Sequence, residues 1–512
     1  MKFKTAIFLM LLFVIPHHQT LAAPPDLNFT VNMSEAVTVN TGGGTPRIAV
    51  DVGGQTRYAS YASGSGSAAL TFAYAPTIGD LDLDGIALSS PVDLNGGTIT
   101  DLNGNPETNL TFTVPNTSGI KIDYPSLSMD FIYDADGRYT LNGTAYNDLT
   151  SFLGASGGTF SRASIGTTYA ENSAGSLISF ATNQPRITDK GLLIEEQKTN
   201  LALYSSGAGP AWTTSAFGTA PFANFTTTTN YPTIAGPDGT FTATRLQRTP
   251  LSGTDGNCHV QNVAVGAGTY TMSFYARTTS GGTFNTAFGV CCTGINSQTV
   301  VTFDGTWRRY YRTVTLSSPV TTGFRIITHS SAEGPVDLLV WGFQVEVGNF
   351  PTSYIPTTTA AVTRAADNLN IPTASWYNQN AGSFFNDISW QSSTGSLYPT
   401  FFRVDGAGGN KWHAYYNQSG GNIAVDGFTN GVSQGAWGVA SSTSGTAKIS
   451  AAQELNNANA AFNGTIKTLD TIWSPPNVSQ LNLYGSNANK WFGKIKYYPI
   501  RTSDAQLQLL TQ

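Results

Sequence analysis

Short runs in which apolar and polar residues alternate recur along the chain, and this pattern restricts its fold more than any other feature. RIAVDVGG at 47–54 and GTYTMSFYAR at 268–277 are two examples. A period of two places one set of side chains on each face of a strand, and Gly, Pro, Asn or Asp bound the runs as turn residues. With 54 glycines among 512 residues and no long helical repeats, the sequence predicts an all-β, multi-domain protein built from β-sandwiches.

The first 22 residues are predicted to be a secretory signal peptide. Lys2 and Lys4 precede an apolar run at 6–15, and Thr20-Leu21-Ala22 resembles a small-residue cleavage site. The apolar run is too short for a stable membrane span, and no other stretch approaches the ~18 apolar residues that a span requires. We therefore expect a secreted or bacterial cell-surface protein without a membrane-spanning segment. An N-terminal membrane anchor is the alternative interpretation.

The charges and cysteines narrow the possible partners. The formal net charge is −5, and charged residues make up only 11% of the chain, without the basic stripe that nucleic acid would require.

The three cysteines are Cys258, Cys291 and Cys292. In an exported protein they favour one disulfide from Cys258 to one of the vicinal pair, with Cys291 as the first candidate and three unpaired thiols as the alternative. No Cys/His spacing typical of a metal site is present.

Residues 23–118 have short strands separated by Gly-rich turns, which indicates a β-sandwich. The order of four segments resembles one Ig-like, cadherin-like repeat of bacterial surface adhesins. They are NFTVNMSEAVTV, RIAVDVGGQTRYASYASGSGSAALTFAY, GDLDLDGIAL and LNGGTITDLNGN.

A candidate calcium site lies within this region. Asp80, Asp82 and Asp84 occupy alternate positions before Gly85, and carboxylate oxygens beside a glycine turn suit Ca²⁺. The twelfth position is Pro91 instead of Glu, so the loop is not an EF-hand. A three-Asp turn between strands is often only a solvated loop, and a Ca²⁺ site is the candidate we set beside that interpretation; adhesin repeats of the kind it resembles often use Ca²⁺ for rigidity.

Residues 119–200 are predicted to be a connector that contributes β-strands. It resembles a module of phage tail-associated and prophage-encoded proteins, in which this module leads into a carbohydrate-binding-like jelly roll. The residues that carry the resemblance are Phe160–Ser164, Tyr169, Asn183, Pro185, Arg186, Gly191–Glu196 and Thr199–Leu201.

Two further regions resemble carbohydrate-binding folds. Residues 201–360 contain GTYTMSFYAR, DGTWRRYYRTVTL and VDLLVWGFQVEVGNFPTSYIPT, and they resemble a carbohydrate-binding jelly roll. Residues 361–512 end in LNLYG, FGKIKYYP and RTSDAQL, and they resemble the closing strands of laminin-G-like, concanavalin-like lectin domains. The Arg-Ala sequences at 161–164 and 363–366 flank the jelly roll, which suggests that it is inserted into the lectin-like sandwich unless the match is chance.

The adjacent Glu195 and Glu196 are not predicted to be catalytic. Neighbouring residues on a strand point to opposite faces, so these two carboxylates cannot flank one glycosidic bond. From residue 367 onward Glu454 is the single glutamate, so the paired acidic motif of concanavalin-like glycosidases is missing. We interpret Glu195 and Glu196 as part of a solvated turn, or as a weak local salt bridge to Arg186 or Lys190. No enzyme activity is expected.

Aromatic residues make up 12% of the chain and suggest glycan binding, because aromatic platforms and amide side chains suit the two faces of a sugar. Core packing is the alternative for each candidate. The candidates are Trp212, Tyr310, Trp412, His413, Tyr415, Tyr416, Asn417, Gln418, Asn487, Asn489 and Trp491.

The sequence as a whole predicts an adhesin-like protein that binds a cell-surface glycan or glycoprotein without catalysis. Shallow sites bind firmly when several copies act together, so a homo-oligomer or array is expected. The alternative is a structural or assembly protein, such as a stalk or a phage tail-fibre-like component of a virion. A glycoside hydrolase is the least favoured interpretation.

Overall fold

The computed structural model describes residues 24–132, 138–163, 166–217, 225–249, 256–292, 295–328, 336–392, 398–486 and 488–512. The predicted signal peptide lies outside the described residues. Antiparallel strands dominate the described chain, which has two short α-helices, α1 (Leu149–Ser156) and α2 (Asp504–Leu510). The predicted all-β fold is confirmed. Among the described residues, no helix is long and apolar enough to span a membrane.

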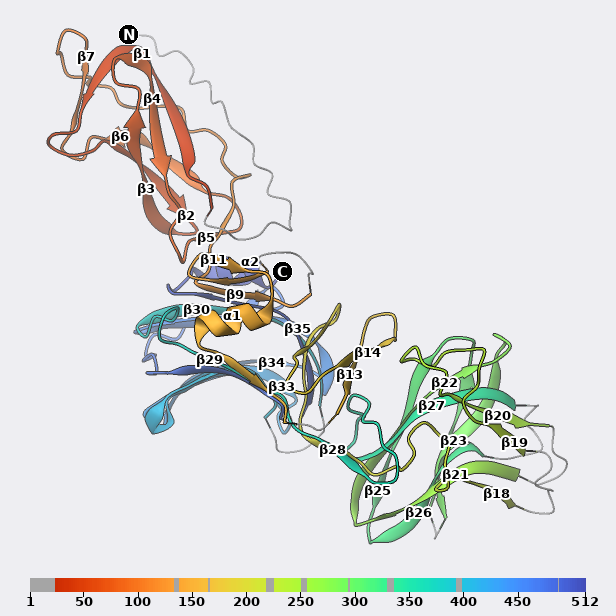
Figure 1. Ribbon diagram of the computed structural model, residues 1–512. Helices are drawn as coiled ribbons and strands as arrows, with labels where there is room; N and C mark the ends of the chain where they lie inside the picture. Colours follow the sequence, from red (N-terminus) through yellow and green to blue (C-terminus); the bar gives the residue numbers. More distant parts are fainter. Residues whose placement is uncertain are drawn as a thin grey trace.

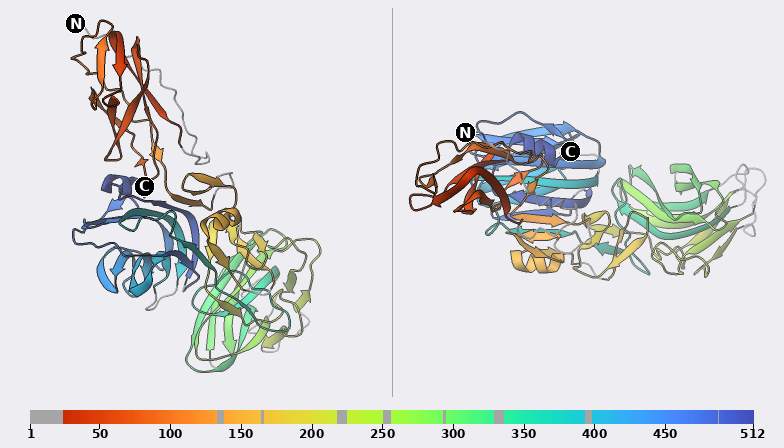
Figure 2. Two further views of the ribbon diagram at one scale, coloured as in Figure 1. Left: turned by 60° about the vertical axis from the view of Figure 1, so that its left-hand side comes forward. Right: turned by 90° about the horizontal axis from the view of Figure 1, so that it is seen from above.

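Three β-rich lobes follow one another in space, with the C-terminal sandwich in the middle (Figures 1 and 2). The N-terminal lobe is an antiparallel sheet in the order β6-β2-β3-β4-β1-β7. Its alternating sequence fills one core, in which Ile48, Val50 and Phe72 are fully buried. The strands are β1 (Leu27–Asn40), β2 (Arg47–Val52), β3 (Gln55–Ser63), β4 (Ser67–Tyr74), β6 (Ala87–Asp93) and β7 (Thr98–Asp101).

The central lobe is a sandwich of a ten-stranded and a seven-stranded sheet around the largest core. The ten-stranded sheet contains β9 (Leu127–Asp130), β10 (Tyr139–Leu141), β11 (Thr144–Tyr146), β15 (Arg186–Thr188), β16 (Gly191–Ile194), β30 (Ala381–Ser392), β35 (Ser444–Glu454), β36 (Asn457–Phe462), β37 (Thr465–Ile466) and β39 (Ala488–Tyr498). The seven-stranded sheet contains β12 (Thr159–Ser161), β29 (Asn368–Pro372), β38 (Gln480–Tyr484), β31 (Thr400–Asp405), β32 (Lys411–Asn417), β33 (Asn422–Thr429) and β34 (Val432–Ala440), in that order.

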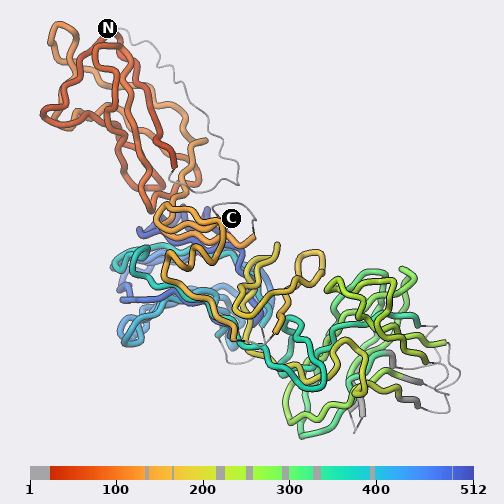
Figure 3. Tube along the Cα trace, in the orientation of Figure 1, coloured from red at the N-terminus to blue at the C-terminus, as the bar shows by residue number. Residues whose placement is uncertain are grey.

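The jelly roll is an insertion within this central sandwich. Strands β9 and β16 both pair with β39, and β12 pairs with β29, so segments on either side of the jelly roll share the same sheets. The central sandwich therefore does not begin at residue 361, because it includes strands from the region treated as a connector. Figure 3 traces the chain out of the central lobe and back. Where it leaves and returns, β17 (Lys198–Asn200) pairs with β28 (Val362–Arg364).

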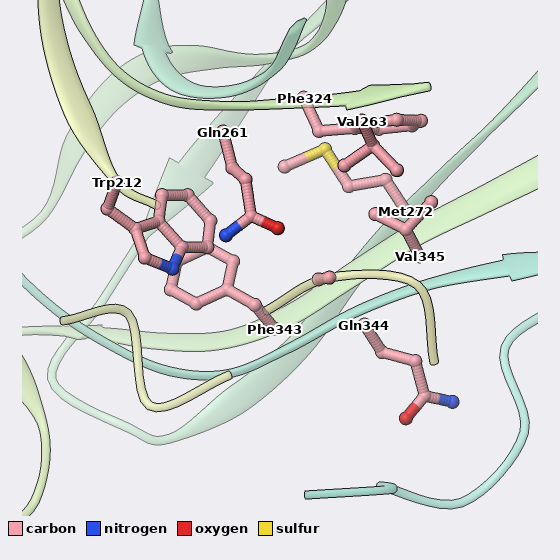
Figure 4. Close-up of a pocket in the computed structure, with 9 residues that line it drawn as sticks. Trp212, Gln261, Val263, Met272, Phe324, Phe343, Gln344 and Val345 are labelled. Atoms are coloured by element: carbon pink, nitrogen blue, oxygen red, sulfur yellow. The ribbon is translucent and has the colours of Figure 1, made fainter. Parts of the chain in front are cut away.

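The inserted lobe consists of two five-stranded sheets around a dry apolar core. Figure 4 shows Trp212, Met272 and Phe343 in this interior, where the remaining gap has no room for a water molecule. One sheet contains β18 (Thr213–Phe217), β21 (Gly256–Val265), β26 (Val320–Thr328), β23 (Phe284–Cys292) and β24 (Ile295–Phe303). The other contains β19 (Phe225–Thr228), β20 (Thr244–Arg248), β27 (Val336–Val347), β22 (Gly268–Thr278) and β25 (Arg308–Leu316).

The strand order contradicts the predicted disulfide between Cys258 and Cys291. Cys258 is buried on β21 and Cys291 lies on β23, with β26 between these two strands. Strands two places apart in a sheet are about 9.5 Å apart, whereas a disulfide requires Cα atoms within about 7 Å. The side chains of Cys291 and Cys292 are outside the described residues.

A hairpin between the two sandwiches joins the inserted lobe to the central lobe. It consists of β13 (Thr168–Glu171) and β14 (Leu177–Phe180). Tyr169 and Leu177 pack against aromatic residues of the jelly roll, whereas Ala170 and Phe180 pack against Leu193 of the central sandwich. The hairpin thus packs against both lobes.

A network of five buried charges lies beside this hairpin. Arg162, Arg186, Arg364, Glu195 and Asp367 are each at most 1% exposed. Arg186 Nη1 lies 2.7 Å from Glu195 Oε2 and Arg162 Nη1 lies 2.9 Å from Asp367 Oδ1, while Arg186 also bonds Asp367. Arg364 Nη2 lies 3.4 Å from Glu195 Oε2. Glu195 is therefore paired with Arg186 in the interior, and its interpretation as a residue of a solvated turn is wrong.

The network keeps Glu195 ionised despite burial. Burial by itself raises the pKa of Glu195, but the attraction of Arg364 and Arg186 and the hydrogen bonds from Ser353 outweigh it and hold this pKa at about 2. Ser353 donates its backbone N–H to Glu195 Oε1 at 2.8 Å, and Asp367 Oδ2 accepts from the Glu195 N–H at 2.9 Å. The acids thus also tie together backbone segments that are far apart in sequence.

Neutralising Asp367 is expected to destabilise the protein strongly. Asp367→Asn keeps the side-chain size but leaves three buried guanidinium groups facing one carboxylate, which should cost about 3–5 kcal/mol. Glu196 pairs with Lys198 at 3.0 Å but is only 20% exposed. The matched control is therefore Asp93→Asn, because Asp93 pairs with Arg47 at 2.8 Å and is 48% exposed, and the loss of an exposed pair should cost little. Urea unfolding followed by tryptophan fluorescence measures both variants. Equal, small losses would contradict a stabilising role for the network.

Candidate functional site

The face of the seven-stranded sheet that points away from the core carries a band of polar side chains, and we call it the outer face. Strand register places its residues in two rows across the sheet. The first row is Thr159, Asn370, Asn482, Arg403, His413 and Asp426. The second row is Gln480, Asp405, Lys411 and Phe428.

Hydrogen bonds link the two rows. Gln480 Nε2 donates to Asn482 Oδ1 at 2.8 Å, and Asn482 Nδ2 donates to Asp405 Oδ2 at 2.9 Å. Arg403 Nε donates to the other oxygen of Asp405 at 2.5 Å. These mutual bonds fix the side chains before any ligand arrives, which lowers the entropy cost of binding.

A shallow cavity of about 320 Å³ opens at one end of the outer face. Its rim is built by two turns that Asn410 holds together: the Asn410 Nδ2 donates to the Ala407 carbonyl at 2.7 Å, and its Oδ1 accepts from the Asn430 N–H at 2.8 Å. Gly406 is required there, because a Cβ would lie 2.0 Å from the Asn477 carbonyl oxygen. The lining residues are Arg403, Asp405, Gly406, Gly409, Asn410, Lys411, Phe428 and Gly431.

Lys411 and Phe428 form the apolar and cationic part of this cavity. They are direct cross-strand partners, and the Lys411 Nζ lies 4.1 Å from the centre of the Phe428 ring. This is a cation–π contact. Both side chains are half-buried, so the cavity combines an aromatic surface, a cation and one side-chain amide, that of Asn410.

A second cluster on the outer face surrounds Asp426. Asp426 pairs with His413 and accepts from the Tyr415 hydroxyl at 3.1 Å. Burial and the charge of Asp426 raise the pKa of Tyr415, so this hydroxyl stays protonated and acts as a donor. Tyr398, half-exposed, packs edge-on against Tyr415 with ring centres 5.5 Å apart.

Strand β32 divides the predicted cluster at 412–418 between the two faces of the sheet. His413 and Tyr415 lie on the outer face, whereas Trp412 and Tyr416 belong to the core. Asn417 ends the strand, half-buried, and Gln418 is buried just after it. All of these residues but Gln418 belong to a strand inside a sandwich, and for Trp412 and Tyr416 the alternative of core packing holds.

The other predicted contact residues are mostly structural. Trp212 stacks on His259 with ring centres 4.8 Å apart, and Tyr310 packs against Phe303. Asn489 is buried and donates to the Pro351 carbonyl at 2.8 Å. Trp491 is half-buried beneath Lys190, whose Nζ lies 5.0 Å from the ring centre. Asn487 lies outside the described residues.

The three aspartates at 80–84 are not brought together as calcium ligands. Asp80 accepts from Arg57 Nε at 2.8 Å and from the Thr77 N–H at 2.7 Å. Asp82 accepts from the backbone of Gly53 and Gly85, and Asp84 accepts from Gln506 Nε2 of α2 at 2.6 Å. Among the described residues, no group of three His, Cys, Asp or Glu side chains could hold a metal.

Calcium is therefore expected to leave the stability of the N-terminal lobe unchanged. The carboxylates already have protein partners, so Ca²⁺ would have to displace them. Thermal unfolding in excess CaCl₂ and in excess EGTA should give Tm values within about 1 °C of each other. A Tm that rises by several degrees with Ca²⁺ would restore the calcium interpretation.

Several residues of the outer face are binding candidates that were not predicted from the sequence. They are Arg403, Asp405, Lys411, Phe428 and Asn482. Aromatic content directed attention to Trp and Tyr instead. Alternation in the sequence could have indicated that these polar residues share one face of a strand. Arg403 and Asp405 occupy alternate positions in FFRVD, and Gln480 and Asn482 do so in QLNLY. Which strands lie beside one another depends on pairings between distant segments.

The stacked pair of Trp212 and His259 gives a pH-dependent prediction. Burial lowers the pKa of His259 to about 4, although a hydrogen bond to the Gly207 carbonyl opposes the shift. In the unfolded chain the His259 imidazole takes up a proton near pH 6.5. The contribution of the neutral, buried His259 to the free energy of unfolding is therefore fully present above pH 6.5 and is lost as the pH falls toward 4. The loss should be on the order of 3 kcal/mol.

The variant His259→Phe retains a ring for the stack and removes the titration. Urea unfolding monitored by tryptophan fluorescence at neutral pH and near pH 4.5 should show a smaller pH dependence for His259→Phe than for the wild-type protein. An identical pH dependence in both proteins would show that another group is responsible.

Comparisons with known proteins find no matching family model and no matching curated protein. The receptor-binding domain of botulinum neurotoxin mosaic serotype C/D is 11% identical with a TM-score of 0.24, over 28% of this chain and 39% of that chain. The N-terminal CBM22-1–CBM22-2 tandem domain of Paenibacillus barcinonensis Xyn10C is 9% identical with a TM-score of 0.21, over 59% of this chain and 98% of that chain. A glycoside hydrolase family 32 protein from Bifidobacterium adolescentis has a TM-score of 0.16 and 10% identity, over 93% of this chain and 99% of that chain.

Proposed function

We propose that the protein binds a cell-surface glycan or glycoprotein without catalysis, on the outer face of the seven-stranded sheet. The observation that carries this proposal is the cavity of about 320 Å³, which continues into a band of Asn, Gln, Asp and Arg side chains. Amides and charged groups can bond sugar hydroxyls, while Phe428 offers an apolar surface to the C–H groups of a sugar ring.

The carboxylates of the outer face favour binding over hydrolysis. A glycosidase needs one carboxylic acid that can donate a proton and a second carboxylate facing it across the bond. Here Asp405 accepts from Arg403 and Asn482, and Asp426 accepts from Tyr415 and pairs with His413. Both acids are committed to holding neighbouring side chains in place.

The wider role that we propose is that of a secreted or cell-surface, adhesin-like protein acting as an oligomer or array. A shallow cavity gives weak individual contacts, and several linked copies would strengthen them. The alternative is a stalk or tail-fibre-like assembly protein, in the latter case part of a virion. The hairpin β13–β14, which packs against both the jelly roll and the central sandwich, supports this alternative because a spacer needs fixed joints.

A glycan array with the mature full-length protein tests this proposal. Phe428→Ala should weaken binding about tenfold, because it removes the apolar platform. Phe241→Ala is the matched control, since Phe241 is an exposed phenylalanine of the inserted lobe (53% exposed), and it should bind like the wild-type protein. A folded protein that binds no glycan would favour the assembly role, and release of reducing sugar would revive the hydrolase.

A further inference from the structure

We infer that the cavity selects acidic saccharides, and that the ammonium group of Lys411 recognises their carboxylate or sulfate groups. This inference rests on the proposed glycan-binding function and specifies the ligand class of the same site. It depends on the balance of charge in the cavity, on the surroundings of Lys411 and on the open rim.

The charges that line the cavity leave one cation without a counter-ion. Three lining residues are charged: Arg403, Asp405 and Lys411. Asp405 is directly opposite Lys411 across the strands, but its two oxygens accept from Arg403 Nε at 2.5 Å and from Asn482 at 2.9 Å. Arg403 and Asp405 thus compensate each other, and within the described parts of the chain Lys411 has no carboxylate within ion-pair distance. The cavity is net positive on a chain whose net charge is −5.

The position of Lys411 suits an anion that enters from solvent. Its ammonium lies over the Phe428 ring at 4.1 Å, which holds the long side chain in place and removes water from one side of the charge. A partly dehydrated cation attracts an incoming anion more strongly than a fully hydrated one does. Because Lys carries a compact charge with three donors, it can bond either a carboxylate or a sulfate.

The rim leaves room for the sugar that carries the anion. Gly409 and Gly431 line the cavity with φ values of +78° each, and neither has a side chain to cover Lys411. On the other side, Asn482 and Gln480 continue the polar band away from the charge. Asn482 itself is buried and its amide already bonds Gln480 and Asp405. A sugar acid can therefore place its charged group at Lys411 and a hydroxyl at the half-buried Gln480 side chain.

Isothermal titration calorimetry with the full mature chain measures this preference. The ligands are a galacturonic acid hexamer, a chondroitin sulfate hexamer and neutral maltohexaose, with polyglutamate as a control for simple charge attraction. We expect at least one acidic hexamer to bind about tenfold more tightly than the neutral one. This difference should shrink between about 50 and about 300 mM NaCl, because salt screens the contact.

Lys411→Gln should reduce the preference to within about threefold, with unchanged thermal unfolding. The matched control is Lys467→Gln, because Lys467 also lies over a phenylalanine ring, Phe462, at 5.8 Å but outside the cavity, and it should keep the full preference. Equal binding of acidic and neutral hexamers, or a preference that survives Lys411→Gln, overturns the inference while glycan binding stands. Polyglutamate bound as tightly as the sugar acids also overturns it. No binding of any saccharide overturns the proposed function itself.

Discussion

The buried network of three arginines and two carboxylates is the interaction on which the arrangement of the lobes depends. Arg162 and Arg186 lie before the jelly roll in sequence, and Arg364 and Asp367 lie after it, so the network joins the two crossings between lobes. Removing charges from water is costly, and the cost is recovered only when every partner is in place. The network therefore favours one arrangement: the chain must leave and re-enter the central sandwich at the same point for Glu195 and Asp367 to be paired.

A different device joins the N-terminal lobe to the central one. The Gln506 side chain accepts from the Leu83 N–H at 2.9 Å and donates to Asp84 at 2.6 Å, while Asp123 bonds both Lys496 and Tyr498. The contact of Asp123 with Lys496 is an ion pair whose carboxylate side chain is 31% exposed, so solvent screens it more than it screens the buried network. Of the three aspartates that resemble a calcium loop, Asp84 thus belongs to the contact between the N-terminal and central lobes.

Much of the fold could be predicted from local pattern, because a period of two directly reports which side chains share a face. In β2 the alternate residues Ile48, Val50 and Val52 are all buried. The same rule separates Trp412 and Tyr416 from His413 and Tyr415. It does not say which pair faces the core, since both pairs are aromatic. That choice depends on the second sheet, which covers the Trp412 side and is assembled from segments hundreds of residues apart. Pairings at such separations, including Glu195 with Arg364, leave no local signal.

The position of the candidate site follows from the same packing constraint. Two broad sheets enclose a thick core that large side chains must fill, and Trp376, Trp412 and Trp473 are fully buried there. Because the largest aromatic residues fill the core, the outer face carries mainly polar side chains and a few half-buried rings. Its specificity must then come from hydrogen bonds and charge, with little help from extended aromatic platforms. If the protein binds glycans as proposed, the ammonium of Lys411, which has no carboxylate partner among the described residues, is therefore better placed than the tryptophans to distinguish one sugar from another.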